Sequence, residues 1–451
     1  MGQSKSMCCA VREKEMGVVN THAGFSTSIP KFHCIDLEVE MDGPSFMLFG
    51  PLWQKAPSGT GWRRIALASK KQVRVYRIKD AFGPDVLSSG AGEADTANPE
   101  MVLEHMLEVP QGRSVTSIVF CEETSSRTIA VAFAAQDSRP QEASFVRIWN
   151  LDMLSSEITA SQRPDSAKWT LEKGQIATLE GQPSPFMMLT TSATYLFGAL
   201  TSGECIVWQK SGIYSKRGAA KLHQTGVADM SADRNFLYTT GRGECSVSVW
   251  AMPELTSVLT IDITLPRSIL NSLGKTPASG LKGAIAAPSD SEKQLDAHVR
   301  NVTALRLPLS RWAGSQGSQR SVKAPKGSIY VAGVLSGAAE ISGHGSGVLM
   351  HWTVGEQCLC RSAQLAHKSP IVSMVYGPYD NGPLVTADMY GTCRVWDNVP
   401  TLVCSQQVDL APSSLTASVL FAVEPQIGLY ASAGGKRISV WRRELGLPGT
   451  G

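Results

Sequence analysis

The sequence predicts an all-β fold, a seven-bladed β-propeller of four-stranded antiparallel blades, and three observations predict it. A short ending, in which β-branched residues lead into an aromatic residue, occurs seven times along the 451 residues. Several intervals between these endings approach one common length. Hydrophobic residues make up 43% of the chain and charged residues 18%, which supports a large core and excludes a mostly disordered chain.

Each ending reads as a β-strand, because β-branched and aromatic residues favour the extended, half-buried surface of a sheet. Three intervals, of 42, 44 and 45 residues, match a bare repeat, and the intervals of 59, 73 and 102 residues contain insertions. The endings are VRVY at Tyr76, VRIW at Trp149, CIVW at Trp208, SVSVW at Trp250, VLMHW at Trp352, CRVWD at Trp396 and ISVW at Trp441.

The residues before Trp396 show the strands of one unit. The segment LVTADMYGTCRVW reads as a strand, a turn at Gly391 and a second strand. PIVSMVYG before it reads as a third strand, and QCLCRSAQLA as a fourth. Four short strands joined by turns form one propeller blade.

This pattern resembles the WD-repeat β-propellers over about residues 32 to 443. The clearest match is residues 366–397, AHKSPIVSMVYGPYDNGPLVTADMYGTCRVWD. The positions of the family's His, its Ser or Thr, and its closing Trp-Asp pair are held there by His367, Thr386, Trp396 and Asp397. The resemblance implies similar roles for His223 and Thr240 before Trp250.

The repeats also depart from the family at its turn Asp, six residues before the aromatic. Other residues stand at that place: Lys70, Ala143, Ser202, Glu244, Ser346, Tyr390 and Gly435. We therefore expect no blade to hold the family's full polar network. The Gly one position later survives in three repeats, where a tight turn needs positive φ: Gly203, Gly347 and Gly391.

A ring of blades must close, because an open ring leaves an edge strand with unpaired backbone groups. FHCIDLEVE, residues 32–40, alternates apolar and polar residues and has no repeat partner before it. We predict that it forms the outer strand of the last blade, beside LTASVLFA, LYASAG and RISVW. Fewer or more than seven blades remain alternatives, because Tyr76 is the weakest ending and the 102-residue interval has room for an eighth.

Four polar stretches rich in Gly, Pro, Ser and Ala interrupt the repeats, at residues 80–100, 152–174, 264–297 and 310–327. Their composition predicts surface loops rather than further domains. The ring then occupies residues 32–443. We expect flexible segments on either side, at residues 1–31 and 444–451.

Residues 297–327 contain six Lys and Arg residues and no acidic residue. The plainer interpretation is a solvated loop beside a strand. The alternative is a contact with an anion, from RNA, an acidic tail or lipid head groups, through Arg311, Arg320, Lys323 and Lys326. Only Trp312 could stack on a base and the net charge is only +3, so the sequence does not favour nucleic-acid binding.

The N-terminal sequence MGQSKSMCCA matches the pattern for N-myristoylation, with Gly2 after Met1 and Ser6 in the sixth place. One myristoyl chain binds a membrane only marginally, and stable anchoring takes a second signal. Palmitoylation of Cys8 and Cys9 would supply it. The alternative is a chance match in an unmodified tail.

No stretch of the sequence is long and apolar enough for a spanning helix, and the N-terminus lacks the pattern of a secretory signal. Apart from Cys8-Cys9 and Cys358-x-Cys360, the ten Cys residues are scattered singly, and they form no CxxC pair. We expect a protein of the cytoplasm with reduced thiols, held at the cytoplasmic face of a membrane if its N-terminus is acylated.

Motifs for catalysis are absent: the sequence has no GxSxG elbow, P-loop, HExxH or EF-hand spacing. We predict that the chain is not an enzyme and takes no cofactor, metal or small-molecule substrate. His344 and His351 are expected in a loop, and Cys358 and Cys360 in a blade rather than on zinc. Asp388 is expected to cap a turn.

The remaining function is binding by shape. We predict a non-catalytic scaffold or adaptor that recruits other proteins, tethered to a membrane by its acylated N-terminus. The alternative is a soluble structural subunit of a large cytoplasmic, cytoskeletal or ribonucleoprotein assembly. Both come from analogy with the family that the repeats resemble.

Overall fold

The computed structural model describes the strands of the chain and many of the turns between them. The described residues are 32–38, 46–49, 54–55, 61–79, 101–121, 127–135, 143–155, 174–180, 183–211, 213–265, 298–307, 327–336, 347–355, 358–376, 384–397, 403–409, 420–424, 429–434 and 437–443.

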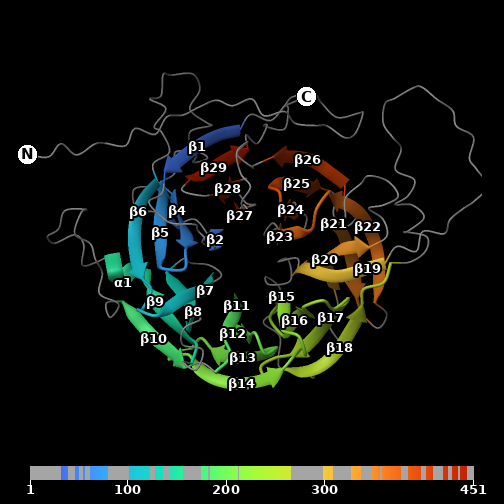
Figure 1. Ribbon diagram of the computed structural model, residues 1–451, viewed down its shortest axis with the longest axis horizontal. Coiled ribbons are helices and arrows are strands. Elements are labelled where there is room, and N and C mark those ends of the chain that lie inside the picture. The colour runs from blue at the N-terminus through green and yellow to red at the C-terminus, as the bar shows by residue number, and fades with distance from the viewer. Residues whose placement is uncertain are drawn as a thin grey trace, which may run out of the picture.

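The strands form antiparallel sheets that stand side by side around a central axis, as the blades of a propeller (Figure 1). Six sheets have four strands, and the sheet that begins with β2 has a fifth, the two-residue β3. The predicted all-β propeller of four-stranded antiparallel blades is therefore confirmed. Each predicted aromatic ending lies on the third strand of its sheet.

The strands near the N-terminus form two neighbouring sheets. The sheet that begins with β2 contains β2 (Phe46–Phe49), β3 (Gln54–Lys55), β4 (Gly61–Ala68), β5 (Gln72–Lys79) and β6 (Met101–Glu108). The next contains β7 (Arg113–Phe120), β8 (Thr128–Ala135), β9 (Phe145–Asn150) and β10 (Gln175–Glu180). The helix α1 (Leu151–Ser155) follows β9.

The middle of the chain forms three four-stranded sheets. The first contains β11 (Phe186–Thr191), β12 (Tyr195–Leu200), β13 (Glu204–Gln209) and β14 (Ser215–Lys221). The second contains β15 (Val227–Ala232), β16 (Phe236–Gly241), β17 (Ser246–Ala251) and β18 (Thr256–Asp262). The third contains β19 (His298–Arg306), β20 (Gly327–Ser336), β21 (Gly347–Val354) and β22 (Leu359–His367).

The last two sheets bring the two ends of the ring together. One contains β23 (Ile371–Tyr376), β24 (Leu384–Asp388), β25 (Thr392–Asp397) and β26 (Val403–Asp409). The other contains β27 (Leu420–Glu424), β28 (Leu429–Gly434), β29 (Arg437–Arg443) and the N-terminal β1 (Phe32–Glu38).

The N-terminal strand completes the last sheet, as the sequence predicted. β1 pairs antiparallel with β29, with Ile35 opposite Val440 and Asp36 opposite Ser439. The first strand of that sheet, β27, lies against β2 of the N-terminal sheet. Two distant parts of the chain thus share one blade, and the ring closes beside it (Figure 1).

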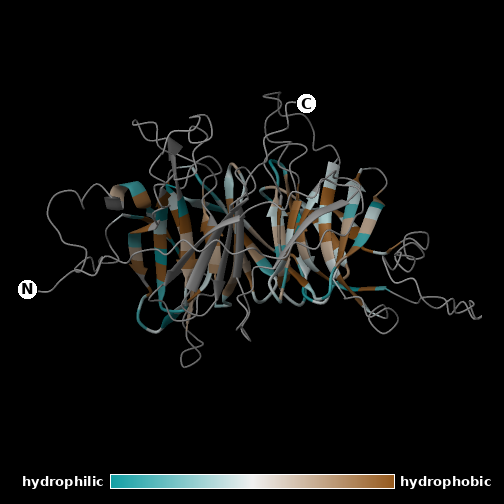
Figure 2. Cartoon of the chain, turned by 90° about the horizontal axis from the view of Figure 1, so that it is seen from above, coloured by the Kyte–Doolittle hydropathy of each residue, from teal (hydrophilic) through white to brown (hydrophobic). Residues whose placement is uncertain are grey.

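The core lies between the sheets rather than within any one of them. Apolar side chains of neighbouring sheets form shared clusters, such as Val249 of β17 with Val331 of β20. In the side view, hydrophobic residues follow the strands (Figure 2). Trp149, Trp208, Trp352 and Trp396 pack in these layers, with Trp149 only 1% and Trp396 only 2% exposed. Core packing therefore explains these Trp residues, as expected.

The outermost strands carry a repeated irregularity. In six sheets the pairing of the third and fourth strands shifts next to the closing aromatic, which leaves one bulged residue on the outer strand. A bulge makes an exposed edge a poor template for another strand. The bulged residues are Glu104, Ile176, Arg217, Val258, Arg361 and Ser405.

Three of the four predicted insertions lie almost entirely outside the described residues, at 80–100, 264–297 and 310–327. The stretch 152–174 begins within α1, so its first residues are helical rather than loop. Asn150 explains this start, because its Oδ1 accepts the backbone N–H groups of Asp152 (3.0 Å) and Met153 (3.2 Å) as an N-cap. The predicted end segments, 1–31 and 444–451, also lie outside the described residues.

Within the part of the chain that the structure describes, no helix has the length and apolar character needed to cross a bilayer.

Candidate functional site

One face of the ring gathers two kinds of connection. The turn between the second and third strands of a blade and the link into the next blade both open on this face. Backbone hydrogen bonds join them: Gly203 O accepts from Leu222 N at 2.8 Å, and Gly226 O accepts from Arg242 N at 2.9 Å. We call this surface the turn face. Its described segments include residues 69–72, 109–116, 143–144, 183–187, 201–204, 222–228, 241–245, 298–300, 367–373 and 388–392.

A chain of buried polar groups fixes the turn face in the β23–β26 blade. Trp396 Nε1 donates to Thr386 Oγ1 at 2.9 Å, and the same oxygen lies 2.6 Å from His367 Nε2. Because indole only donates, the Thr386 hydroxyl gives its own hydrogen to His367 Nε2. His367 Nδ1 then faces Asp388 Oδ2 at 3.4 Å.

Asp388 ends this chain by holding the turn itself. Its Oδ1 accepts the backbone N–H groups of Tyr390 (3.0 Å) and Thr392 (2.9 Å), so the predicted turn capping is confirmed. Burial raises the pKa of Asp388, but His367 and the Thr392 N–H outweigh it and lower the pKa overall. Burial also lowers the pKa of His367, which favours the neutral ring.

A second complete chain lies in the β15–β18 blade. Trp250 Nε1 donates to Thr239 Oγ1 at 2.8 Å, and that oxygen lies 2.7 Å from His223 Nε2. His223 Nδ1 lies 2.8 Å from Glu244 Oε2. The expectation that no blade holds a full polar network is therefore wrong. Glu244 replaces Asp in this blade, and in the other blade Asp388 stands two residues before the expected place.

The predicted role of Thr240 is also wrong. Thr239 makes the bonds, and the buried Thr240 Oγ1 has no hydrogen-bond partner. Thr386 stands ten residues before its Trp, and the same count back from Trp250 gives Thr240. The turn in the β15–β18 blade is one residue longer, so the threonine that pairs across to the third strand is Thr239, opposite Ser248.

His351 was expected in a loop, but it lies on β21 and is only 2% exposed. Its ring stacks on Tyr330 with centroids 5.0 Å apart, and its Nε2 lies 3.0 Å from Ser328 Oγ. Burial, with the charge of Arg361, lowers the pKa of His351 to about 4. His344 lies outside the described residues.

Metal ligands do not gather anywhere in the described ranges: no group of three or more His, Cys, Asp or Glu residues could hold an ion there. Cys358 and Cys360 are free and partly buried beside β21. Burial raises the pKa of the Cys360 thiol to about 11.

The turn face also carries regular bulges. In five blades the first strand bulges near its start, where the chain arrives from the preceding blade. A bulge turns the extra residue out of the ladder and re-aims its side chain. These residues are Thr116, Met187, Ala228, Arg300 and Val372.

The turn face of one blade exposes three large apolar side chains, and the two blades before it add cations. Val372 is 53% exposed, Met389 44% and Tyr390 68%, although large apolar side chains are usually buried. The cations Arg242, Arg300 and Lys368 are exposed as well. We call these six residues the basic–apolar patch.

The predicted lipidation residues Gly2, Cys8 and Cys9 lie outside the described residues. The predicted anion site, Arg311, Arg320, Lys323 and Lys326, also lies outside them.

The described part of the basic stretch is split along β19. Arg300 is exposed on the turn face, whereas Arg306 Nη1 lies 2.7 Å from Asp229 Oδ2 on the neighbouring blade. β19 ends and β20 begins on the face opposite the turn face. The sequence did not single out Val372 or Met389, and it marked Tyr390 only as a replacement for the turn Asp, because an exposed residue beside a turn has no periodic signal.

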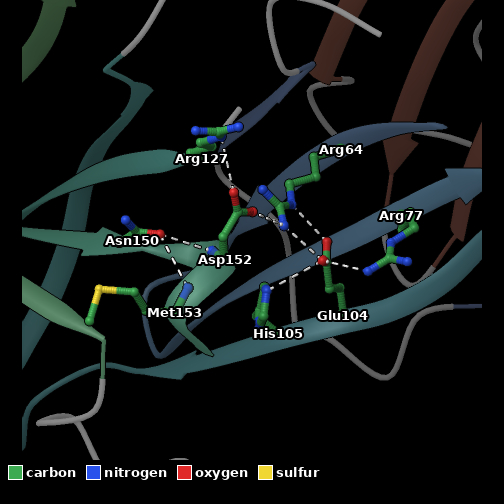
Figure 3. Close-up of polar contacts among 8 residues, drawn as sticks. All are labelled: Arg64, Arg77, Glu104, His105, Arg127, Asn150, Asp152 and Met153. Atoms are coloured by element: carbon green, nitrogen blue, oxygen red, sulfur yellow. Dashed lines mark hydrogen bonds and ion pairs between the residues drawn. The ribbon is translucent and has the colours of Figure 1, made fainter. Parts of the chain in front are cut away.

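A second charged cluster lies on the outer rim, where α1 meets β6 (Figure 3). Arg64 is only 1% exposed and binds both oxygens of Glu104, at 2.7 and 2.8 Å. Its Nη2 also donates to Asp152 of α1 at 3.0 Å. Arg77 Nη2 donates to Glu104 at 2.8 Å, and Arg127 Nε lies 3.1 Å from Asp152. This cluster joins the N-terminal blade to the next, and each of its two carboxylates is paired with two arginines.

The comparisons with known proteins add little. No family model matches the sequence, and no curated protein matches it. Among solved structures, a chain from the crystal structure of a mitotic checkpoint complex is similar. It shares 12% sequence identity and a TM-score of 0.48, over 94% of this chain and 99% of that chain. That likeness carries no argument about function.

Replacing Thr239 with Val should destabilise the protein by about 2 kcal/mol, because it leaves Trp250 Nε1 and His223 Nε2 without their shared partner. Thr240→Val is the matched control and should stay within about 0.5 kcal/mol of wild type or stabilise it, since that hydroxyl is already unpaired. Urea unfolding of both variants measures the difference. Equal effects would contradict the assignment of Thr239.

The ionisation of Glu104 makes the free energy of unfolding depend on pH in the acid range. Burial raises its pKa, but hydrogen bonds from Arg64 and His105 outweigh burial and hold the pKa far below its usual range. The ionised Glu104 therefore adds to the free energy of unfolding at pH values above its unfolded pKa of about 4.3. This contribution is lost progressively as the pH falls below that value. Glu104→Gln should remove this part of the acid dependence of the unfolding free energy, measured by urea titration at several pH values. Glu254→Gln, at an exposed carboxylate, should leave it unchanged.

Proposed function

We propose that this chain is a non-catalytic protein-interaction scaffold of the WD-repeat type, which binds partner proteins through its turn face. The sheet that contains β3 is counted as a blade, so the proposed ring has seven. One observation carries the proposal. The two turns that expose Arg242, Met389 and Tyr390 are those above the two chains of buried polar groups.

Rigid turns favour recognition because a side chain that is already positioned loses less entropy on binding. The Met389–Tyr390 turn is held by Asp388 and by the bond from Met389 N to Pro370 O at 3.2 Å. Exposed Tyr and Arg side chains are also enriched among the residues that dominate binding energy. The turn face therefore combines suitable residues with a fixed backbone.

The rim is a poorer candidate for the interaction surface. The outer strands bulge beside the closing aromatic in six blades, which interrupts the edge that another strand would need. The buried histidines also support a binding role rather than a chemical one. His223 and His367 are each engaged with a threonine and a carboxylate that hold neighbouring strands together.

The finer proposal is that the N-terminus tethers this scaffold to the cytoplasmic face of a membrane, with myristate on Gly2 and palmitate on Cys8 and Cys9. The sequence pattern supports it. The position of β1 is compatible with it, because β1 is the outermost strand of its blade. Phe32, where β1 begins, lies opposite Arg443 at the end of β29 that is away from the turn face.

Gly2→Ala removes the acceptor of the proposed myristate and should move the protein from the membrane fraction to the soluble fraction of lysed cells. Cys8→Ser with Cys9→Ser should leave only transient membrane binding, because a single chain anchors marginally. If Gly2→Ala fractionates like the wild type, the proposed lipid tether is contradicted, and the alternative, a soluble structural subunit of a larger assembly, is favoured.

A photo-crosslinking residue in place of Tyr390 tests the turn face directly. We expect it to link the protein to specific partners in cells, identified by mass spectrometry. The matched control is the same residue in place of Ile213, which is 85% exposed between β13 and β14 on the opposite face. Equal linkage of the same proteins from both positions would contradict a turn-face scaffold.

A further inference from the structure

We propose that the basic–apolar patch binds an acidic segment of a partner protein that also presents apolar side chains. The inference rests on the proposed function, since it names the kind of partner that the turn face takes. It follows from which charges on this face are exposed and which are already engaged.

The cations of the patch are exposed and have no ion pair with another described residue. Arg242 lies in the turn before β17, Arg300 is the bulged residue of β19, and Lys368 follows β22. The first two are held close together: Glu244 O accepts from Val302 N at 3.0 Å, and Cys245 Sγ lies 2.8 Å from Arg300 O. Two adjacent blades are thus joined at the segments that carry Arg242 and Arg300.

Three described carboxylates on the blades that carry the patch are bonded to other groups. Glu244 is bonded to His223, and Asp388 is buried against His367 and two backbone N–H groups. Asp229 accepts from Leu305 N (2.8 Å) and from Arg306. Among the described residues, these three carboxylates therefore do not neutralise the positive charge of the patch. Asp262, which is exposed, lies on the outermost strand β18.

The apolar half of the patch sits on the next blade. Met389 and Tyr390 form the turn between β24 and β25. Val372 is the bulged residue beside Ile371, which pairs with Asp388 at the foot of that turn. β19 and β23 are neighbouring first strands of adjacent blades, so the bulges at Arg300 and Val372 follow one another around the ring (Figure 1).

This composition favours a protein segment over nucleic acid or a lipid surface. Single-stranded nucleic acid needs aromatic side chains for successive bases, and Tyr390 is the single exposed aromatic among the patch residues. A membrane favours a broad basic surface, whereas here three apolar side chains stand next to three cations. A chain that alternates carboxylates with apolar side chains matches both halves at once.

A display library of random peptides of about twelve residues, selected on the full-length protein, tests this chemistry. We expect enriched peptides to carry excess Asp and Glu together with Leu, Ile or Phe. A variant with Arg242→Glu, Arg300→Glu and Lys368→Glu should bind the enriched peptide at least about tenfold more weakly in fluorescence anisotropy. Met389→Ala with Tyr390→Ala should weaken it independently, without changing any charge.

The matched control reverses three exposed cations on the outer strand β14, Lys216, Arg217 and Lys221, for the same change in net charge. It should leave the affinity within about twofold of wild type. Folding of every variant is checked by circular dichroism. If the triple patch variant fails to fold, Arg300→Gln alone replaces it and should still weaken binding.

Several results would overturn the inference. Enriched peptides without excess acidic residues would do so, as would equal loss of affinity in the β14 control. Fluorescein-labelled oligouridylate and phosphatidylserine vesicles serve as the other probes. Binding of either that competes with the peptide and is lost in the patch variant would assign the patch to that ligand instead. Crosslinks from position 390 to non-acidic partner segments would leave the scaffold function standing and reject its acidic partner. If position 390 crosslinks to no partner, both the scaffold function and the acidic partner segment are rejected.

Discussion

The fold depends on one constraint: the described sheets bury their apolar side chains against neighbouring sheets. The clusters that form the core span neighbouring blades, as Phe186 and Trp208 of one blade pack with Ile148 of the blade before it. A sheet at an open end of such an arc would expose half of its core. The pairing of β1 with β29 removes that end by building the last blade from both ends of the ring. The blade positions, and hence the turn face, follow from this closure.

Closure also determines which surfaces remain for recognition. The first strands are covered by one another around the axis, and bulges interrupt the outer strands. The surfaces that remain are the connections between strands. On the turn face, His223, His367 and their hydrogen-bond partners hold two of these connections in place. Buried hydrogen bonds within a blade thus set the geometry of the exposed turn that they support.

Much of this architecture could be read from the sequence, because a repeated ending marks the third strand of each blade. The alternation of residues 32–40 was enough to identify β1 and its partner sheet. Details that depend on turn length were missed. Counting ten residues back from Trp250 gave Thr240 instead of Thr239, because the turn in this blade has one extra residue. Contacts between distant residues left no local signal. Arg64 binds Glu104 and Asp152, which are 40 and 88 residues away.

Disulfide trapping across the closing strands tests the central claim most directly. Asp36 and Ser439 are paired across β1 and β29, within the Cα separation of about 4.4 to 6.8 Å that a disulfide spans. Cysteines at both positions should form a bond on mild oxidation, identified by mass spectrometry of the linked peptides. Cysteines at 36 and 432 should not, because Ser432 lies opposite Ser439 on β28, one strand further away. Failure of the first pair to link, or equal linkage of the second, would contradict closure of the ring by β1.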